Sequence, residues 1–152
     1  MRNIQQFDKL NLVNETREKN AGKRLAIDND HMEQMQEQLQ KLIAYREEYK
    51  EKLNQQINQI ESAESIRDYH NFIRVLDKAI EDQRLVVDQS VQQSAQSREQ
   101  WIHSKNEVRK VDKIKEHAIK ENRYQESLRE QKQSDELSLN FQTRHQDNNS
   151  FA

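Results

Sequence analysis

The sequence contains no proline and only one glycine in 152 residues. Sheets and tight turns depend on glycine, proline, Asn-Gly and Asp-Gly, so their near absence disfavours β structure and favours long, unbroken helices. Hydrophobic residues make up 32% of the chain, well below the roughly 45–50% of globular proteins, which argues against one compact core. Low hydrophobicity is typical of disordered chains, but a net charge of only -2 is not. A long helical or coiled-coil chain therefore fits best.

Apolar residues recur at alternating steps of three and four along two stretches of the chain. This 3.5-residue period is typical of a helix that pairs with another helix. The first seam contains Phe7, Leu10, Ala21, Leu25, Met32, Met35, Leu39, Leu42, Tyr49, Leu53, Ile57 and Ile60, with Asp28 and Arg46 at two of its positions. The second contains Ile66, Tyr69, Ile73, Leu76, Ile80, Gln83, Val87, Ser90, Ser94, Ser97, Trp101, Ser104, Val108 and Val111, and it fades at Lys115, Ala118 and Asn122.

The two seams are out of phase across residues 58–65, where a turn is expected. Ser65 followed by Asp68 matches an N-terminal capping box, and Ser62 is a second candidate cap. The predicted fold is all-α, a long antiparallel two-helix coiled-coil hairpin that we expect to be monomeric by itself. The hairpin occupies residues 1–140 as a single domain, with helix 1 at about 4–59, a turn at about 60–65, helix 2 at about 66–140, and a disordered tail over 141–152.

The heptads allow two registers for this hairpin. Facing residue numbers add up to about 122 in one register and about 129 in the other, one heptad apart. The first places Trp101 opposite Ala21, whereas the second places it opposite Asp28. We prefer the first because it pairs the indole with alanine and does not bury a charge against it. The repeat itself does not decide between them.

Several classes of protein and site are disfavoured by the sequence. No apolar run approaches the roughly 18–20 residues that span a bilayer, and the polar start MRNIQQ lacks a secretory apolar region. The near-neutral charge does not support nucleic-acid binding. We therefore expect a cytoplasmic protein.

Candidate catalytic and metal-binding residues are also lacking. The chain has no cysteine, and none of its five histidines has a second histidine at i+3 or i+4. No glycine-rich loop is available to bind phosphate. A two-helix hairpin also has too few walls to enclose a pocket. We expect neither enzymatic activity nor a cofactor, metal ion or small-molecule substrate.

Charge is unevenly distributed along the predicted hairpin. Residues 1–27 and 103–132, which come together at the end opposite the turn, hold 15 basic and 9 acidic side chains. Residues 28–102 hold 9 basic and 15 acidic side chains. Opposite charges at the two ends allow charged partners to orient the molecule.

One flank of the predicted pair is unusually aromatic. Flank positions in a lone hairpin are usually charged, yet Tyr45 and Phe72 occupy them on one side, which suggests a partner surface. That flank contains Gln38, Tyr45, Phe72, Ala79 and Val86, whereas the other contains Gln36, Ile43, Lys50, Asp77, Arg84 and Val91.

Two segments give the chain a resemblance to a known family. The stretches LQKLIAYREEYKEKLN (39–54) and YHNFIRVLDKAIEDQR (69–84), with Trp101 and the basic segment after it, resemble the flagellar export protein FliJ. The resemblance covers roughly residues 30–110. It implies an antiparallel coiled coil similar to the γ-subunit rod of rotary ATP synthases. It also implies three partners: the hexameric flagellar export ATPase, the cytoplasmic domain of the FlhA export gate, and export chaperones. The expected location is the cytoplasmic side of the inner-membrane export apparatus.

The resemblance also assigns partner-binding residues. The family's gate-facing patch maps onto Gln38, Leu42, Tyr45, Tyr49, Phe72, Leu76, Ala79 and Gln83. At Gln83 the sequence departs from the family, which has histidine there. Glutamine still forms hydrogen bonds but cannot take a positive charge. For the ATPase ring, the basic end suggests Arg109, Lys110 and Lys113 as contacts.

Three other functions are consistent with a coiled-coil chain. One is the equivalent stalk of a virulence type III secretion injectisome, which genomic neighbourhood would distinguish. Another is a prefoldin-like or general coiled-coil chaperone that holds unfolded clients. The third is a homodimeric structural coiled coil, which sedimentation would separate from a monomeric hairpin.

Overall fold

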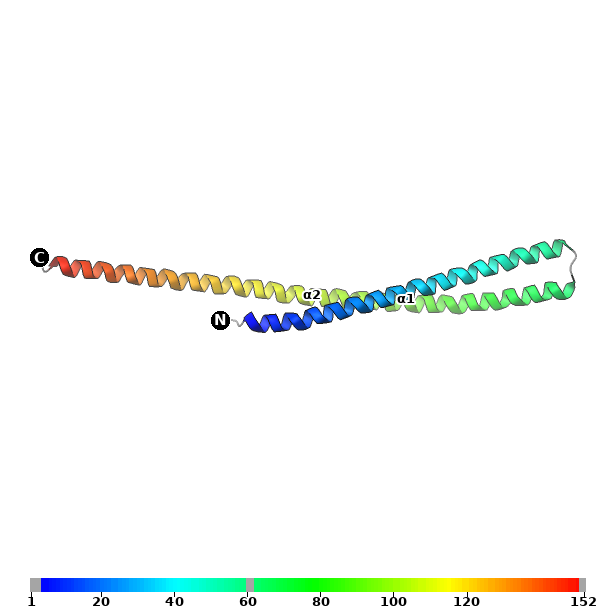
Figure 1. Cartoon of the computed structure of the whole chain (residues 1–152), viewed down its shortest axis with the longest axis horizontal. Helices are drawn as coiled ribbons and strands as arrows, with labels where there is room; N and C mark the ends of the chain where they lie inside the picture. Colours follow the sequence, from blue (N-terminus) through cyan, green and yellow to red (C-terminus); the bar gives the residue numbers. More distant parts are fainter. Residues whose placement is uncertain (1–3, 60–61, 151–152) are drawn as a thin grey trace. The chain divides into compact units, whose positions relative to one another are not determined.

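The computed structural model describes residues 4–59 and 62–150 of the chain (Figure 1). Two helices, α1 (Ile4–Asn58) and α2 (Ala63–Ser150), account for all of these residues except Gln59 and Ser62. The predicted all-α helical hairpin is confirmed. The contacts between α1 and α2 divide the chain into two compact units: Thr16–Lys105, and Met1–Glu15 with Asn106–Ala152.

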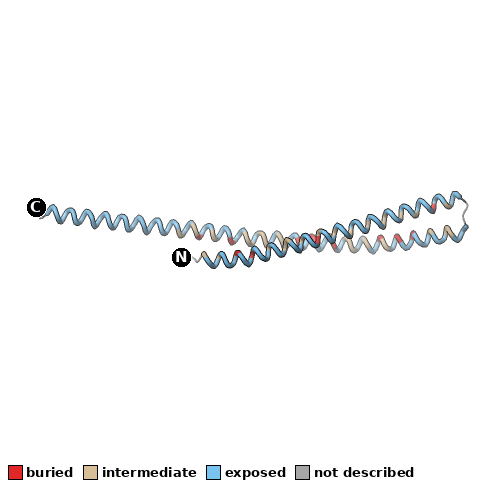
Figure 2. Tube along the Cα trace, viewed as in Figure 1, coloured by how far each residue is buried: buried red, intermediate tan, exposed pale blue. Residues whose placement is uncertain are grey.

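In the Thr16–Lys105 unit, α1 and α2 pack side by side as an antiparallel pair. The cyan part of α1 runs along the green part of α2 in Figure 1. The apolar core of this unit is small and consists of Leu53, Ile73, Leu76 and Ile80, which are 2–8% exposed. In Figure 2 the buried positions of this unit, in red, recur at intervals along both helices. Every predicted α2 seam residue from Ile66 to Ser104 is buried or half-buried, so the heptad prediction is confirmed for this helix.

For two residues of α1 the prediction of a place in the seam is wrong. Leu10 is 48% exposed and Ile57 is 51% exposed. The helical repeat decides which side chain faces α2, whatever its hydrophobicity. Three residues beyond Leu53 the repeat reaches Gln56, which is half-buried, and near the start of α1 it reaches Asn11, which is buried. Ile60, also predicted in this seam, lies outside the described residues.

The turn is closed by Ser62. Helix α1 ends at Asn58, and the backbone N–H of Gln59 donates to the carbonyl of Gln56 at 3.1 Å. The Ser62 Oγ accepts a hydrogen bond from the Ser65 backbone N–H at 3.3 Å, which is the N-cap arrangement. Helix α2 therefore starts at Ala63, three residues before the predicted position, and Ser65 lies inside it. Of the two candidate caps, Ser62 and not Ser65 is the N-cap of α2.

Contacts within the Thr16–Lys105 unit fix its register. Arg46 Nη1 lies 3.3 Å from Asp77 Oδ1, and the Ser94 hydroxyl donates to Asn29. Trp101 lies against Gly22, where a Cβ would be 3.3 Å from the indole Nε1. Facing residue numbers in these pairs add up to about 122, within the scatter of knobs-into-holes packing. The preferred register is thus the one observed.

In the other unit, the start of α1 packs on α2 through a partly polar seam. Val111 and Ala118 of α2 are 6% and 2% exposed, but the buried residues that α1 contributes to this unit are Asn11 and Asn14. The Asn11 amide donates to the Asp112 carboxylate. Asp8 forms an ion pair with Lys115. This unit has few buried apolar side chains.

The end of α2 differs from the prediction. A disordered tail was predicted from residue 141, but α2 continues to Ser150. Residues 123–150 are all exposed, as the pale blue end of α2 in Figure 2 shows. The helix continues because this segment has no glycine or proline to break it. Residues 151–152 of the predicted tail lie outside the described part of the chain.

Candidate functional site

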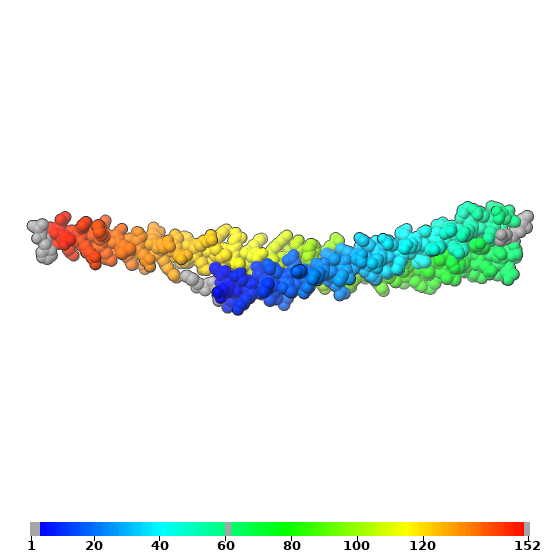
Figure 3. Space-filling view, in the orientation of Figure 1, coloured from blue at the N-terminus to red at the C-terminus, as the bar shows by residue number. Residues whose placement is uncertain are grey.

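The Thr16–Lys105 unit holds all the residues predicted to face an export gate. We call them the aromatic flank: Gln38, Leu42, Tyr45, Tyr49, Phe72, Leu76, Ala79 and Gln83. The register places them as four facing pairs, 38 with 83, 42 with 79, 45 with 76, and 49 with 72. The two outer pairs are in direct contact, through Gln38 with Gln83 and through Tyr49 with Phe72. Their segments, cyan in α1 and green in α2, adjoin in Figure 3.

Three aromatic rings cluster at the end of the aromatic flank nearest the turn. The Tyr49 ring lies 4.4 Å from the Phe72 ring, centroid to centroid, at a tilt of 47°. It also lies 6.0 Å from the Tyr69 ring, and the Lys52 ammonium sits 5.1 Å from its centroid. Tilted aromatic pairs at these distances are attractive. Tyr69 was assigned only to the seam, although its position three residues before Phe72 is the signal that joins it to this cluster.

The residues of the aromatic flank differ in how far they reach solvent. Tyr45 is 56% exposed and Phe72 is 41% exposed, so both aromatic side chains reach solvent. Tyr49 is half-buried. Leu76, by contrast, is 7% exposed and belongs to the core. Tyr45 and Phe72 are therefore the large side chains of the aromatic flank that are open to solvent, whereas Leu76 is not.

Gln83 joins the two helices at the other end of the aromatic flank. Its amide Nε2 donates to the Met35 backbone carbonyl at 3.0 Å and to Gln38 Oε1 at 3.5 Å. The Met35 carbonyl belongs to the backbone of α1. The Gln83 amide therefore links α2 directly to the α1 backbone. Gln83 therefore has a structural role within the hairpin in addition to any contact with a partner.

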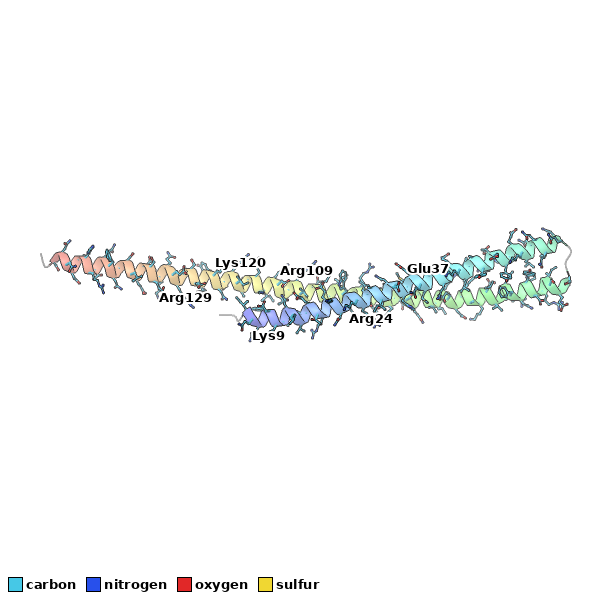
Figure 4. All side chains as sticks on the ribbon, in the orientation of Figure 1. Lys9, Arg24, Glu37, Arg109, Lys120 and Arg129 are labelled. Atoms are coloured by element: carbon cyan, nitrogen blue, oxygen red, sulfur yellow. The ribbon has the colours of Figure 1, made fainter. Side chains whose placement is uncertain are left out.

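The predicted ATPase-facing residues belong to the unit that contains Asn106–Ala152. Arg109, Lys110 and Lys113 are all exposed on α2, and Figure 4 labels Arg109 among the side chains projecting from this helix. Lys110 forms an ion pair with Glu107 at 3.1 Å. Among the described residues, no carboxylate forms an ion pair with Arg109 or Lys113.

A buried carboxylate lies between the helices of the Thr16–Lys105 unit. Asp28 is 7% exposed and Ser97 is 1% exposed, and the Ser97 hydroxyl donates to Asp28 Oδ2. Gln93 Nε2 and Arg24 Nε also lie 3.3 Å from this oxygen. The hydrogen bond from Ser97 is the largest influence and lowers the pKa of Asp28, although burial acts in the opposite direction. The sequence placed Asp28 in the seam but did not identify these partners.

The lowered pKa predicts how acid affects stability. The unperturbed value for this carboxyl is 3.8. Because folding lowers it, the stabilisation by Asp28 is complete above that pH and is lost as the pH falls through the folded-state value. We expect the unfolding temperature of the wild-type chain to fall more steeply with acid than that of Asp28→Asn, which does not titrate. Circular dichroism melts between neutral pH and about pH 2.5 measure this. Parallel pH profiles for the two chains would contradict it.

The described residues contain no group of three or more metal-ligating side chains, and neither described helix has a stretch long and apolar enough to cross a membrane.

Comparison with known proteins gives one family. The sequence matches the family model described as Flagellar FliJ protein over residues 3–147. The match includes the whole aromatic flank and the basic residues Arg109, Lys110 and Lys113. Comparisons with curated proteins and with solved structures gave no match.

Proposed function

Since the chain belongs to the flagellar FliJ protein family, a family associated with flagellar protein export, we propose that it is a non-enzymatic stalk of the export apparatus. In this proposal one part of the hairpin docks in the hexameric export ATPase and the aromatic flank contacts the cytoplasmic domain of the export gate. The protein transmits the state of the ring to the gate and assists delivery by export chaperones. It acts in the cytoplasm, at the inner-membrane export apparatus, and hydrolyses nothing itself.

The exposed aromatic side chains of the aromatic flank carry this proposal. Tyr45 and Phe72 are 56% and 41% exposed at positions that are usually charged in a lone hairpin. Tyrosine and other aromatic residues dominate the binding energy of many protein interfaces. The Tyr49 ring behind Phe72 holds it in place, so little side-chain freedom is lost on binding. These features support a contact with a protein surface.

Docking at the ATPase is supported by charge. Arg109 and Lys113 have no ion-pair partner among the described residues and are exposed. The sequence segments 1–27 and 103–132 together carry 15 basic and 9 acidic side chains. Such a surplus steers association with an acidic surface. The aromatic flank lies in the acidic part of the sequence, so the two partners are recognised by different chemistry.

Substitution of the exposed aromatic residues tests the gate contact. Phe72→Ala and Tyr45→Ala are each expected to weaken binding to the purified cytoplasmic domain of an FlhA-type gate by about tenfold, the typical range for an interface aromatic. Isothermal titration or a quantitative pull-down measures this loss. Circular dichroism should show an unchanged helical signal, since neither side chain belongs to the buried core.

Leu85→Ala is the matched control. Leu85 is 61% exposed on α2, but it lies about 140° around the helix from Phe72. The Leu85→Ala substitution removes an apolar side chain from another face of α2, so binding to the gate domain should not change. Equal binding by Phe72→Ala and the wild-type chain, with the helical signal intact, would remove the assignment of the aromatic flank to the gate.

A further inference from the structure

Three exposed apolar side chains lie on one side of the unit that contains the start of α1. We call them the terminal patch: Leu10 and Val13 of α1 and Ile114 of α2, which are 48%, 48% and 44% exposed. Leu10 and Val13 are three residues apart and are therefore neighbours on the helix surface. Each of the three immediately precedes a buried or half-buried residue of its own helix. In an antiparallel pair such positions lie on the same side of the seam.

The alignment of the two helices places Ile114 beside Leu10. Asn11 donates a hydrogen bond to Asp112, so facing residue numbers add up to 123 in this unit. The ion pair nearer the start of α1 gives the same alignment. Leu10 and Ile114 therefore lie at nearly the same level along the pair, and the three apolar side chains form one continuous surface.

The start of α1 turns a polar face toward α2. Asn11 and Asn14 are 9% and 7% exposed, and the Asn11 Oδ1 is buried without a hydrogen-bond partner among the described residues. Adjacent residues are about 100° apart on a helix, so a rotation of that size would exchange Asn11 for Leu10 and bury more apolar surface. The hydrogen bond to Asp112 holds the observed orientation. The unit therefore buries less apolar surface than it could, and Leu10 stays in solvent.

Positive charge borders the terminal patch. Within this unit, the residues charged at neutral pH that lie three or four positions from the patch are Lys9, before Val13, and Lys110, before Ile114. Lys9 projects from the start of α1 in Figure 4 and has no ion pair among the described residues, whereas Lys110 pairs with Glu107 at 3.1 Å. A complementary surface therefore has apolar side chains in its middle and carboxylates at its edge.

We propose that the terminal patch is the apolar part of the contact with the export ATPase and binds a hydrophobic depression bordered by carboxylates. This inference rests on the proposed docking at the ATPase, for which Lys110 is already an expected contact. Charge then steers the approach, while burial of the terminal patch adds affinity that salt does not screen. A second copy of this chain is a poorer occupant, because two terminal patches face to face would bring Lys9 and Lys110 together.

Substitutions in the terminal patch test the contact. Leu10→Ala and Ile114→Ala should each weaken binding to the purified export ATPase by about tenfold, as for other anchors of a protein interface. Isothermal titration at increasing ionic strength measures this loss. The ratio of variant to wild-type affinity should stay constant with salt, because salt screens charges and not apolar burial. The helical circular-dichroism signal should be unchanged, since neither side chain is in the buried core.

Two variants with matched side chains are the controls. Leu12→Ala removes a leucine that is 66% exposed and lies about 160° around α1 from Leu10. Ile102→Ala removes an isoleucine that is 45% exposed and belongs to the other unit. Neither substitution should change the affinity for the ATPase.

Cysteine labelling locates the contact directly, because the chain has no cysteine of its own. A maleimide should modify both Leu10→Cys and Leu12→Cys in the free chain, where the two positions are exposed. Saturation with the purified ATPase should slow the reaction at position 10 and leave position 12 reactive. Equal protection of the two positions would contradict binding through the side of α1 that carries the terminal patch.

The possible results separate this inference from the proposed function. If the wild-type chain binds the ATPase and Leu10→Ala and Ile114→Ala bind it equally tightly, the terminal patch is not the contact, while ATPase docking stands. Protection of position 10 by the gate domain, or by a high concentration of the chain alone, without protection by the ATPase would give the terminal patch another occupant and overturn the inference. If the wild-type chain does not bind the ATPase, the proposed docking fails and this inference fails with it.

Discussion

Ile80→Ala is expected to destabilise the hairpin by about 2–5 kcal/mol, the usual cost of removing a large aliphatic side chain from a core. Ile80 is 2% exposed, the lowest value among the core residues of the Thr16–Lys105 unit. The loss has a large effect here because two helices share only one seam, in which Asp28, Ser90, Ser94 and Ser97 are also buried. Polar positions contribute little hydrophobic stabilisation, so each apolar one carries more of it. Since small domains are only marginally stable, such a loss can unfold the pair.

Urea denaturation followed by circular dichroism measures the change in unfolding free energy. Val75→Ala is the control, because Val75 is 63% exposed on the same helix and alanine has the higher helix propensity. Its effect should stay within about 0.5 kcal/mol, as for other surface substitutions. An Ile80→Ala chain as stable as Val75→Ala would show that the single seam is not what holds the helices together.

Reversing the charges of Arg109, Lys110 and Lys113 to glutamate should weaken binding to the export ATPase roughly 100-fold at low salt, if these residues face an acidic surface. Each change removes an attraction and adds a repulsion, and like-charge contacts at an interface cost several kcal/mol. The three side chains are exposed, so the fold should tolerate the change. Of the three, Lys110 has an internal ion pair to lose, with Glu107, and such exposed pairs contribute about 0–1 kcal/mol.

Salt and a second surface provide the checks on this result. Because screening acts on exposed charges, the difference between variant and wild type should shrink as ionic strength rises toward 1 M. Lys78→Glu reverses an exposed charge in the other unit, where Lys78 pairs with Asp82 at 3.1 Å, and should leave ATPase binding unchanged. Binding of the triple variant that equals wild type at low salt would contradict ATPase docking through these residues.

The candidate site was partly predictable from the sequence. Heptad counting identified Tyr45 and Phe72 as large aromatic residues beside the seam, and both are exposed. It did not identify Tyr69 as part of the ring cluster around Tyr49, because a seam position does not reveal which neighbour a ring will contact. The family patch included Leu76, which the packing buries. Exposure of a residue at the edge of a seam depends on the partner helix and is not encoded in its own segment.

Two antiparallel helices follow from the heptad pattern alone. An apolar period of 3.5 residues that is interrupted once, without glycine or proline to break the helices, allows little else. The packing of the helices was needed to show that Ser62 and not Ser65 caps α2, that Trp101 rests on Gly22, and that Asp28 meets Ser97. The physical reason is that a heptad pattern matches itself after every seven residues. A contact that does not repeat, such as the missing side chain of Gly22 under the Trp101 indole, distinguishes one register from the next.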